Sequence, residues 1–290
     1  MTKKVNIGDI ANKLRAQFKD DQAKASIIST GAEMLLPTSE DDFILMPPWW
    51  TEATGLKGLP FGYVFMISGN PDSGKTSCTI EAMRCAQEQG IYVILVDTER
   101  KTTRSRLQQW GVDPDNVARV QPRYLEEAYD GIDKWWEAIK DADSSAKILI
   151  IFDSLGNTPA RAEADTDVED SLQMGLAAKL NKRGFRRIVP RLARDKVHVL
   201  VVNQTYTNMG SPGRTNAGGQ AVDYFSVLTF QTSRQKWLER TVKGEQIRVG
   251  ARVQWTAYKN HLIDANSVIQ KKILLDITQD GMSLVGSKEK

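Results

Sequence analysis

The feature that most constrains this chain is the octapeptide GNPDSGKT at residues 69–76. It fits the pattern G-x-x-x-x-G-K-[ST], it follows the apolar run YVFMISG, and a helical pattern comes directly after it. Glycines let backbone N–H groups turn inward around phosphate oxygens, and a helix start adds partial positive charge. Lys75 is placed to reach the β- and γ-phosphates, and the Thr76 hydroxyl to bind Mg²⁺. The sequence therefore predicts a phosphate site made of Gly69, Asn70, Pro71, Asp72, Ser73, Gly74, Lys75, Thr76 and Ser77.

Short apolar runs alternate with helical segments from residue 60 onward. Apolar strands that alternate with helices are typical of a mostly parallel sheet covered by helices on both faces. Toward the C-terminus, residues 247–260 and 267–278 look like two strands joined by a turn, which predicts an antiparallel extension. The predicted strands of the main sheet span residues 63–69, 92–97, 117–121, 147–153, 197–204 and 227–233.

Composition excludes several classes of protein. The chain has 290 residues, of which 41% are hydrophobic and 26% charged, as in ordinary globular proteins. No apolar run approaches the roughly 20 residues that cross a bilayer, and the first ten residues hold no signal-peptide core. Cys78 and Cys85 fall on the predicted helix about 10 Å apart, too far for a disulfide, which favours reduced thiols in a cytoplasmic protein.

Polar side chains follow three of the predicted strands. Asp153 ends one strand, and a carboxylate at that edge can hold Mg²⁺ through water. Asp97 and Glu99 follow another, and Glu99 is the better candidate to orient and deprotonate an attacking water. Each of these acids can instead cap the next helix. Asn203 and Gln204 end a third strand, where an amide can donate to a γ-phosphate.

Two further segments suggest a binding surface. A loop of about 16 residues with four glycines follows Gln204, and loops of that length are functional or disordered. In the predicted helix near residues 176–192, four cations recur at i, i+3, i+4 and i+7, opposite Leu180, Ile188 and Leu192. Such a face suits a phosphate backbone, although many basic faces are only solvated. The four cations are Lys179, Lys182, Arg183 and Arg186.

Residues 7–18 predict a short amphipathic helix with Ile7, Ile10, Leu14 and Phe18 near one face. A terminal helix of this kind must bury its stripe, either on its own domain or on a neighbouring subunit. A looser stretch rich in turn formers and acids follows at residues 29–50, and it predicts a boundary between the N-terminal segment and the rest.

Taken in order, the motifs resemble bacterial RecA and the related phage strand-exchange recombinases. The resemblance covers about residues 25–275, and its specificity comes from the combination, since a phosphate loop alone names only a superfamily. It implies a RecA-like P-loop ATPase core at 36–290 and an N-terminal helix and strand at 1–35 for docking between protomers. The matching segments are ISGNPDSGKTS, VDTER, RLQQWGVDPDNVARVQP, FDSLGNTPARAE, DSLQMGLAAK, VVNQ and NAGGQAVDYFS.

The resemblance also implies roles for individual residues at the nucleotide. Gly69, Gly74, Lys75 and Thr76 would bind ATP–Mg²⁺, and Asp153 would be the second carboxylate of the metal site. Glu99 would be the catalytic glutamate. Gln204 would sense the γ-phosphate at the base of the second DNA-binding loop.

The DNA-binding loops implied by the resemblance lie at about 157–174 and 205–219. Met174 and Met209 occupy positions where the family wedges apolar side chains between base triplets. The donors implied for DNA phosphates are Gly218, Gly219 and Gln220. The N-terminal helix and the Ile27–Ile28 stretch would dock on the next protomer of a helical filament, which favours the neighbouring subunit over the chain's own domain.

Three departures from the family pattern stand out. Arg106 falls where the family stacks an aromatic ring on adenine, and its guanidinium could stack instead. The family reaches the neighbouring γ-phosphate with two lysines separated by an asparagine, and here the segment is Lys259–Asn260–His261. His261 thus replaces one lysine, so Lys259 is expected to act there with His261, unless His261 is a simple surface histidine. No counterpart is seen of the C-terminal domain that gathers duplex DNA or of the acidic tail, which favours a compact phage-type recombinase.

These observations predict an ATP-dependent DNA strand-exchange recombinase, a DNA-dependent ATPase that acts in recombination and repair. It would use ATP and Mg²⁺, coat single-stranded DNA as a homo-oligomeric filament and pair it with homologous duplex. A loader and a single-strand-binding protein are further expected partners, in the cytoplasm of a bacterial or phage-infected cell. Two alternatives stay open: a hexameric helicase-like motor of the same fold, and a non-catalytic DNA-coating protein.

Overall fold

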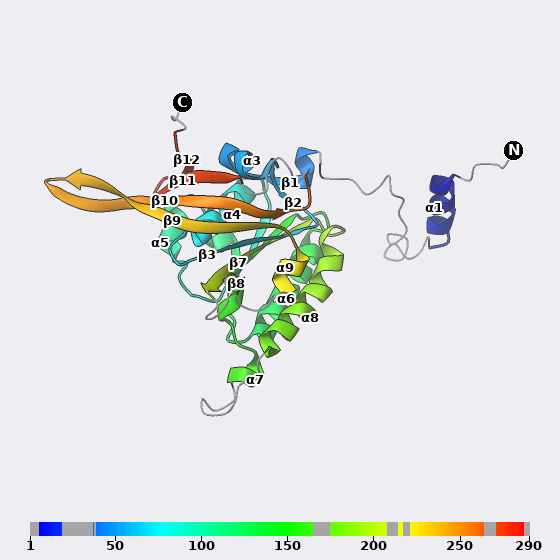
Figure 1. The fold of residues 1–290 in the computed structure, drawn as a ribbon. Coiled ribbons are helices and arrows are strands. Elements are labelled where there is room, and N and C mark those ends of the chain that lie inside the picture. Colours follow the sequence, from blue (N-terminus) through cyan, green and yellow to red (C-terminus); the bar gives the residue numbers. More distant parts are fainter. Residues whose placement is uncertain are drawn as a thin grey trace. The chain divides into compact units, whose positions relative to one another are not determined.

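The computed structural model describes residues 6–18, 37, 39–164, 175–207, 214–216, 221–263 and 271–286 (Figure 1). The chain divides into two units, Met1–Ser39 and Glu40–Lys290. The first contains α1 (Ile7–Ala16), capped by Asn6, whose side chain accepts a hydrogen bond from the Gly8 N–H at 2.9 Å. The Ile27–Ile28 stretch lies outside the described residues.

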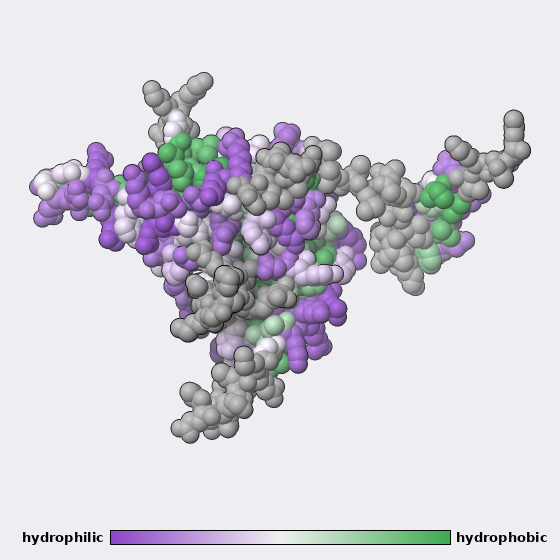
Figure 2. All heavy atoms as spheres, in the orientation of Figure 1, coloured by the Kyte–Doolittle hydropathy of each residue, from purple (hydrophilic) through white to green (hydrophobic). Residues whose placement is uncertain are grey.

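Helix α1 leaves its apolar stripe on the surface. Ile7, Ile10 and Leu14 are 64%, 41% and 39% exposed, and hydrophobic side chains are visible on the helix in Figure 2. Ten residues cannot hold a stable helix in water without packing of such a stripe. The described part of the first unit therefore offers an apolar face that needs a partner.

The second unit is organised by one large sheet. Its parallel part runs β9 (Ser226–Val242), β3 (Val64–Gly69), β7 (Val197–Thr207), β6 (Ile148–Asp153), β4 (Tyr92–Asp97) and β5 (Val117–Val120). On the other side of β9 the sheet continues antiparallel through β10 (Glu245–Asn260), β11 (Lys272–Thr278) and β12 (Gly281–Leu284). The predicted α/β fold, with its mostly parallel sheet and antiparallel extension, is confirmed.

Helices cover both faces of this sheet, because side chains alternate along each strand. On β3, Phe65 and Ile67 pack into one core with α3 (Pro48–Thr54), α4 (Lys75–Glu88) and α5 (Arg104–Gln109). Val64 and Met66 pack into the other with α6 (Leu125–Ala142), α8 (Leu176–Leu192) and α9 (Ala221–Phe225). Figure 1 shows α6 and α8 together on that second face.

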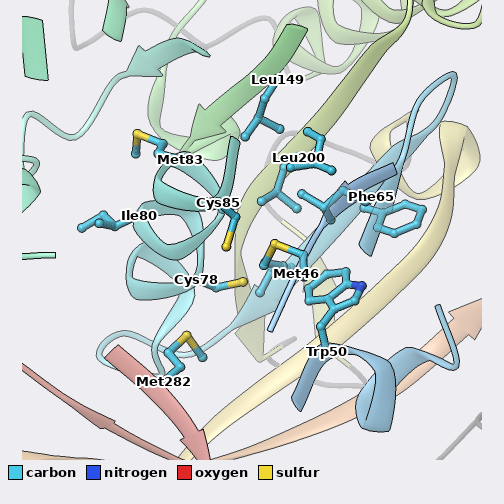
Figure 3. Packing of buried hydrophobic residues seen from close by; sticks show 14 of the residues in the cluster. Met46, Trp50, Phe65, Cys78, Ile80, Met83, Cys85, Leu149, Leu200 and Met282 are labelled. Atoms are coloured by element: carbon cyan, nitrogen blue, oxygen red, sulfur yellow. The ribbon is translucent and has the colours of Figure 1, made fainter. Parts of the chain in front are cut away.

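Helix α4 joins the phosphate loop to the core. Cys78 and Cys85 are free and buried, and in Figure 3 both point from α4 toward the side where Met46 and Leu200 lie. Burial raises the pKa of Cys85 to about 12, so this thiol stays protonated at neutral pH. The prediction of two reduced core thiols agrees with this packing.

The second half of the stretch expected to be loose is ordered in the structure. It forms η2 (Glu40–Asp42), β1 (Phe43–Leu45) and α3, and β1 pairs with β2 (Gly58–Pro60). Trp49 and Trp50 of α3 are buried, and the Trp50 indole N–H donates to the Gly58 carbonyl at 3.1 Å. Local composition missed this because the partners of these residues lie farther along the chain.

Strand β9 extends well beyond its predicted limit at residue 233, β10 begins two residues before its predicted start at residue 247, and the two form a long hairpin that projects from the body of the unit (Figure 1). Its turn residues Lys243 and Gly244 have φ values of 53° and 87°, as a two-residue hairpin turn requires. Residues 234–246 carry polar side chains on both faces of the hairpin. The sequence therefore has no apolar run there that would predict a strand. The hairpin is largely hydrophilic in Figure 2.

The other elements are short. β7 runs past the predicted limit at Gln204 and pairs antiparallel with β8 (Arg214–Asn216). Residues 205–207 and 214–216 of the second predicted loop therefore form a two-stranded ladder. The remaining short helices are η3 (Pro114–Asn116), η4 (Leu155–Asn157) and α7 (Arg161–Ala164). Within the described ranges, every helix is too short or too polar to cross a membrane.

Candidate nucleoside triphosphate site and basic helix

The phosphate loop connects β3 to α4, as predicted. Gly74 immediately precedes α4 with φ 86°, and Asp72 also has a positive φ of 55°. The Ser73 hydroxyl donates to the Asn70 carbonyl at 2.7 Å and lies 2.6 Å from the Thr232 hydroxyl of β9. These hydrogen bonds hold the loop against β9, directly before the first turn of α4.

Two glycines of the loop lie close against neighbouring strands of the sheet. A Cβ on Gly69 would run into the backbone carbonyl and the hydroxyl of Thr232, and one on Gly74 would run into Ile277 of β11. The loop is therefore pressed against two other strands of the sheet. Glycine allows this close approach as well as the backbone turn.

Lys75 is buried at the start of α4. Its ammonium donates to the carbonyls of Gly69 at 3.0 Å and Asn70 at 2.7 Å. Burial lowers the pKa of Lys75, and the nearby carboxylates of Asp153 and Glu99 oppose that effect. The cation is thus held by weak carbonyl acceptors, beside the space that a phosphate group would enter.

Asp153 and Asp97 end neighbouring strands as register partners. Burial raises the pKa of Asp153 to about 6, against a hydrogen bond with Thr76 that lowers it, and Glu99 adds to the increase. Asp97 pairs with Arg119 and accepts from the Arg100 N–H at 2.8 Å, so its oxygens are already engaged. Of these two strand-end acids, it is therefore Asp153 that lines the cavity and contacts Thr76.

The oxygen donors at this point fit a magnesium ion. Mg²⁺ is usually bound by one or two carboxylates together with substrate phosphates and water. Thr76 and Asp153 provide a hydroxyl and a carboxylate in contact, and a cation would favour the charged form of the buried acid. Among the described residues no group of three or more His, Cys, Asp and Glu could hold a metal alone, so phosphate oxygens would have to complete the shell.

Glu99 is the centre of a hydrogen-bond network. The Ser154 hydroxyl and the Gln204 amide each donate to its Oε1 at 2.7 Å, and the Lys101 ammonium lies 2.6 Å from Oε2. Burial alone would raise the pKa of Glu99, but the hydrogen bonds from Lys101, Ser154 and Gln204 outweigh it and hold the pKa below its ordinary value. Glu99 is therefore ionised and fixed in orientation at neutral pH.

These side chains line one cavity of about 520 Å³. The phosphate loop and the polar groups described above form part of its wall. The rest of the wall comes from α5 and from the antiparallel strands. The lining residues are Pro71, Asp72, Ser73, Gly74, Lys75, Thr76, Ser77, Glu99, Lys101, Arg106, Trp110, Asp153, Val202, Gln204, Trp237, Gly250, Ala251, Ile277 and Thr278.

The structure gathers most of the predicted nucleotide residues but not all of them. Gly69 and Asn70 do not line the cavity but hold Lys75 through their carbonyls. Arg106 lines the cavity, with a guanidinium N–H donating to the Ser77 hydroxyl at 3.4 Å. Lys259 and His261 do not line this cavity: Lys259 lies on β10 opposite Thr229 and donates to the Asp223 carbonyl at 2.7 Å.

Several lining residues were missed from the sequence. Lys101 follows Glu99 closely and could have been suspected from its charge. Trp237, Gly250, Ala251, Ile277 and Thr278 come from the antiparallel strands. No local motif marks them, because their position depends on how those strands pair with β9.

Helix α8 carries the predicted basic face. Lys179, Lys182, Arg183 and Arg186 are exposed, and no ion pair joins any of them to another residue in the part of the chain that the structure describes.

By contrast, Arg187 and Arg191 on the same helix bind Asp133 of α6 at 2.6 and 3.1 Å. The helix thus separates cations that hold it to α6 from cations that face outward.

The remaining predicted DNA contacts lie in segments outside the described residues. They are Met174, Met209, Gly218, Gly219 and Gln220.

Comparison with known proteins agrees with this geometry. Residues 47–277 match the family model described as the RecA N-terminal domain. Protein RecA of Streptomyces ambofaciens is 32% identical over 212 residues, which are 72% of this chain and 54% of that protein. Protein RecA of Fusobacterium nucleatum is 30% identical over 211 residues, 72% of this chain and 53% of that protein. The chain therefore spans little more than half the length of these relatives.

Proposed function

This chain belongs to the RecA family, and on that premise we propose that it is an ATP-dependent recombinase that forms a filament on single-stranded DNA and exchanges strands with homologous duplex. The observation that carries the proposal is one cavity lined jointly by the phosphate loop, Asp153, Glu99 and Gln204. A phosphate loop alone would fit many nucleotide hydrolases, whereas this set also supplies a group for water and a link to a DNA-binding segment.

The phosphate loop provides the binding step. Backbone N–H groups at the start of α4 point toward the phosphates, and Lys75 exchanges its two carbonyl acceptors for charged phosphate oxygens, which bind an ammonium more strongly. Thr76 and Asp153 would hold Mg²⁺, which when bound neutralises charge on the phosphate oxygens.

Glu99 orients the attacking water. Because its Oε1 is held by Ser154 and Gln204, the carboxylate cannot rotate freely, and its second oxygen faces Lys101. Lys101 is largely exposed and can move aside to let water reach Oε2. A fixed, ionised carboxylate positions water and accepts its proton during attack on the γ-phosphate.

Gln204 connects hydrolysis to DNA binding. Its amide donates to Glu99, and the β7–β8 ladder begins at the next residue. When a γ-phosphate competes for this amide, the start of the second loop shifts with it. The nucleotide would thus set whether that loop holds DNA.

The DNA surface combines the loops at about 157–174 and 205–219 with α8. The outward face of α8 offers four cations to a phosphate backbone. Apolar and backbone groups of the loops, including Met174, Met209, Gly218, Gly219 and Gln220, would contact bases and phosphates. Such contacts do not distinguish one base sequence from another, so homology would be recognised by base pairing between the DNA strands.

The filament would complete each nucleotide site with a neighbour. The exposed stripe of α1 docks on the next protomer, and Lys259 with His261 reaches the γ-phosphate bound by that protomer. Lys259 does not line the cavity of its own chain and binds the Asp223 carbonyl instead, which suits a role across an interface. A heterologous interface of this kind repeats into a helix.

We place this activity on DNA in the cytoplasm of a bacterial or phage-infected cell. The expected partners are single-stranded DNA, homologous duplex DNA and further copies of the chain. A loader and a single-strand-binding protein are also expected.

The deciding experiment is electron microscopy of the protein on circular single-stranded DNA, with and without a non-hydrolysable ATP analogue, together with ATPase and strand-exchange assays. Filaments that need the analogue, ATPase stimulated by single strands, and exchange only with homologous duplex are expected. Closed rings with unwinding would favour the helicase-like motor, and filaments without any ATPase would favour a coating protein. A monomer that ignores oligonucleotides at saturating ATP would remove the proposal.

A further inference from the structure

Lys101 lines the nucleotide cavity together with two other cations, Lys75 and Arg106. Lys75 donates to carbonyls of the phosphate loop, and Arg106 donates to the Ser77 hydroxyl. Lys101 instead pairs with an acid, and its ammonium lies 2.6 Å from Glu99 Oε2. It therefore occupies the oxygen of Glu99 at which we place the attacking water.

The backbone at Lys101 is held from both sides. The preceding residue, Arg100, has a positive φ of 53°, and its N–H donates to Asp97 Oδ1 at 2.8 Å. The following residue, Thr102, is buried. The segment that leaves β4 thus makes a fixed turn, which keeps Glu99 and Lys101 together in the cavity wall.

The side chain of Lys101, by contrast, can change its acceptor. It is 69% exposed, whereas the side chain of Glu99 is 11% exposed. An ion pair with such an exposed partner contributes little to stability, because water and salt screen it. Ser154 and Gln204 still donate to Glu99 Oε1, so the carboxylate stays in place when the ammonium leaves.

The charges in the cavity wall keep this lysine protonated. Its hydrogen bond to Glu99 raises the pKa of Lys101, and the carboxylates of Asp153 and Asp72 add to the increase. Burial is the main cause of the lowered pKa of Lys75, and the positive charge of Lys101 contributes to it. The two ammonium groups are therefore close enough to repel each other, and an anion in the cavity would offset that repulsion.

We propose that Lys101 is a second phosphate-binding lysine, whose ammonium leaves Glu99 Oε2 and binds the γ-phosphate when ATP enters the cavity. This rests on the proposed function, in that the cavity takes a nucleoside triphosphate. A terminal phosphate carries more negative charge than a carboxylate and has several acceptor oxygens, so an ammonium binds it more strongly. The same movement frees Oε2 for water. The γ-phosphate would thus expose the carboxylate that directs water against it.

Lys101 would supply this charge from the chain that binds the nucleotide. Lys259 and His261, by contrast, are expected to come from the neighbouring protomer. ADP has no γ-phosphate, so with ADP bound the ammonium would stay on Glu99. Lys101 would therefore make the site prefer ATP to ADP.

Equilibrium titration with ATP and ADP tests this preference in the Glu99→Gln variant, in which ATP should survive the measurement. We expect addition of Lys101→Ala to weaken ATP binding about tenfold, as loss of a charged hydrogen bond does, and to change ADP binding less than about twofold. Lys101→Arg should keep the affinity for ATP. Lys101→Met, which keeps the length of the side chain without its charge, should lose it.

Lys57→Ala is the matched control. Lys57 is also exposed and also pairs with a single acid, Glu40 at 3.3 Å, but it does not line the cavity. Its removal should change neither affinity. The titrations are repeated with Glu99 intact and a non-hydrolysable ATP analogue, where the same loss on Lys101→Ala is expected.

Three results would overturn the inference. Unchanged ATP binding in Lys101→Ala would make Lys101 an ordinary surface lysine, and equal losses for ATP and ADP would show that it does not contact the γ-phosphate. A loss that occurs with Glu99 intact but not in Glu99→Gln would mean that Lys101 only neutralises Glu99. A parent protein that binds neither nucleotide would contradict the proposed function itself.

Discussion

Single residues around the phosphate loop divide the charge of the site between fixed and movable groups. Asp97 is engaged by Arg119 and by backbone, and Glu99 is fixed at one oxygen by Ser154 and Gln204. Lys75 and Lys101 hold acceptors that they can exchange. We expect hydrolysis at this site to depend on the fixed acids staying in place while the ammonium groups exchange their acceptors for the nucleotide.

Glu99→Gln provides the first test at this scale. The amide keeps the size of the side chain but cannot accept a proton, so we expect ATP hydrolysis to fall about a hundredfold or more. ATP binding and binding to single-stranded DNA should persist, because neither needs the proton transfer. Steady-state ATPase and nucleotide titration measure the two effects. Glu137→Gln on the exposed side of α6 is the control, and an active Glu99→Gln enzyme would assign the water to another residue.

His198 makes the free energy of unfolding depend on pH. It is fully buried, and burial lowers its pKa to about 4, although a hydrogen bond with the Pro60 carbonyl at 2.7 Å opposes this. The folded protein therefore keeps His198 neutral while the unfolded chain takes up a proton below about pH 6.5. This contribution to stability is complete above pH 6.5 and is lost as pH falls toward 4.

Urea unfolding at pH 7.5 and pH 5 measures this effect. Between these values His198 should remove on the order of 2 kcal/mol from the free energy of unfolding. His198→Gln should lose that part of the pH dependence, whatever its stability at pH 7.5. His261→Gln, at the exposed second histidine, should behave like the parent. An unchanged pH dependence in His198→Gln would mean that other groups cause the acid sensitivity.

At the scale of elements, α8 and the β9–β10 hairpin show how one segment can serve two purposes. One side of α8 is fixed to α6 through Asp133, while the other side presents exposed cations. The hairpin contributes Trp237 to the cavity wall, and its polar tip extends away from the body of the unit. In both elements, side-chain period decides which residues belong to the core and which meet a ligand.

The outward face of α8 can be tested with a double variant, Lys182→Gln and Arg183→Gln, which removes two of its charges. We expect weaker binding to single-stranded DNA and a smaller salt dependence, with the log–log slope reduced by about 0.7 for each DNA phosphate that the variant no longer neutralises. Fluorescence anisotropy at several salt concentrations gives both quantities. Lys134→Gln, an exposed lysine on α6, is the control for loss of surface charge. If the slope does not change, the face is only solvated.

At the scale of the whole molecule, the nucleotide site of one chain lacks the groups that Lys259 and His261 are expected to supply. A closed monomeric enzyme would have them beside the phosphate loop, whereas here Lys259 binds the Asp223 carbonyl. Assembly would therefore be part of catalysis as well as of DNA binding.

Mixing two inactive variants tests this shared site. Lys259→Ala and Glu99→Gln should each have little ATPase on single-stranded DNA. In a random mixture, about a quarter of the interfaces combine an intact Glu99 with an intact Lys259 from the next protomer, so ATPase should return to about that fraction of the parent. Glu99→Gln mixed with a double variant that carries both changes is the control. Absence of recovery would place both residues in the same site of one chain, and a fully active Lys259→Ala variant would place Lys259 outside catalysis.

The sequence by itself determined the elements whose signals are local. The apolar runs located β3, β4, β5 and β6, the motif at residues 69–76 located the phosphate loop, and the polar residues that follow β4, β6 and β7 meet at one edge of the sheet. These features are local because hydrophobic period and strand direction depend only on neighbouring residues.

Only the tertiary structure decided the rest of the site. The place of Trp237 in the cavity wall, the contact of Gly69 with Thr232, and the core position of Trp49 and Trp50 all depend on partners distant in sequence. Pairing register and close packing between distant segments leave no periodic trace in either segment alone. The phosphate loop and the polar residues beside it were therefore predictable, whereas the part of the cavity wall that the antiparallel strands supply was not.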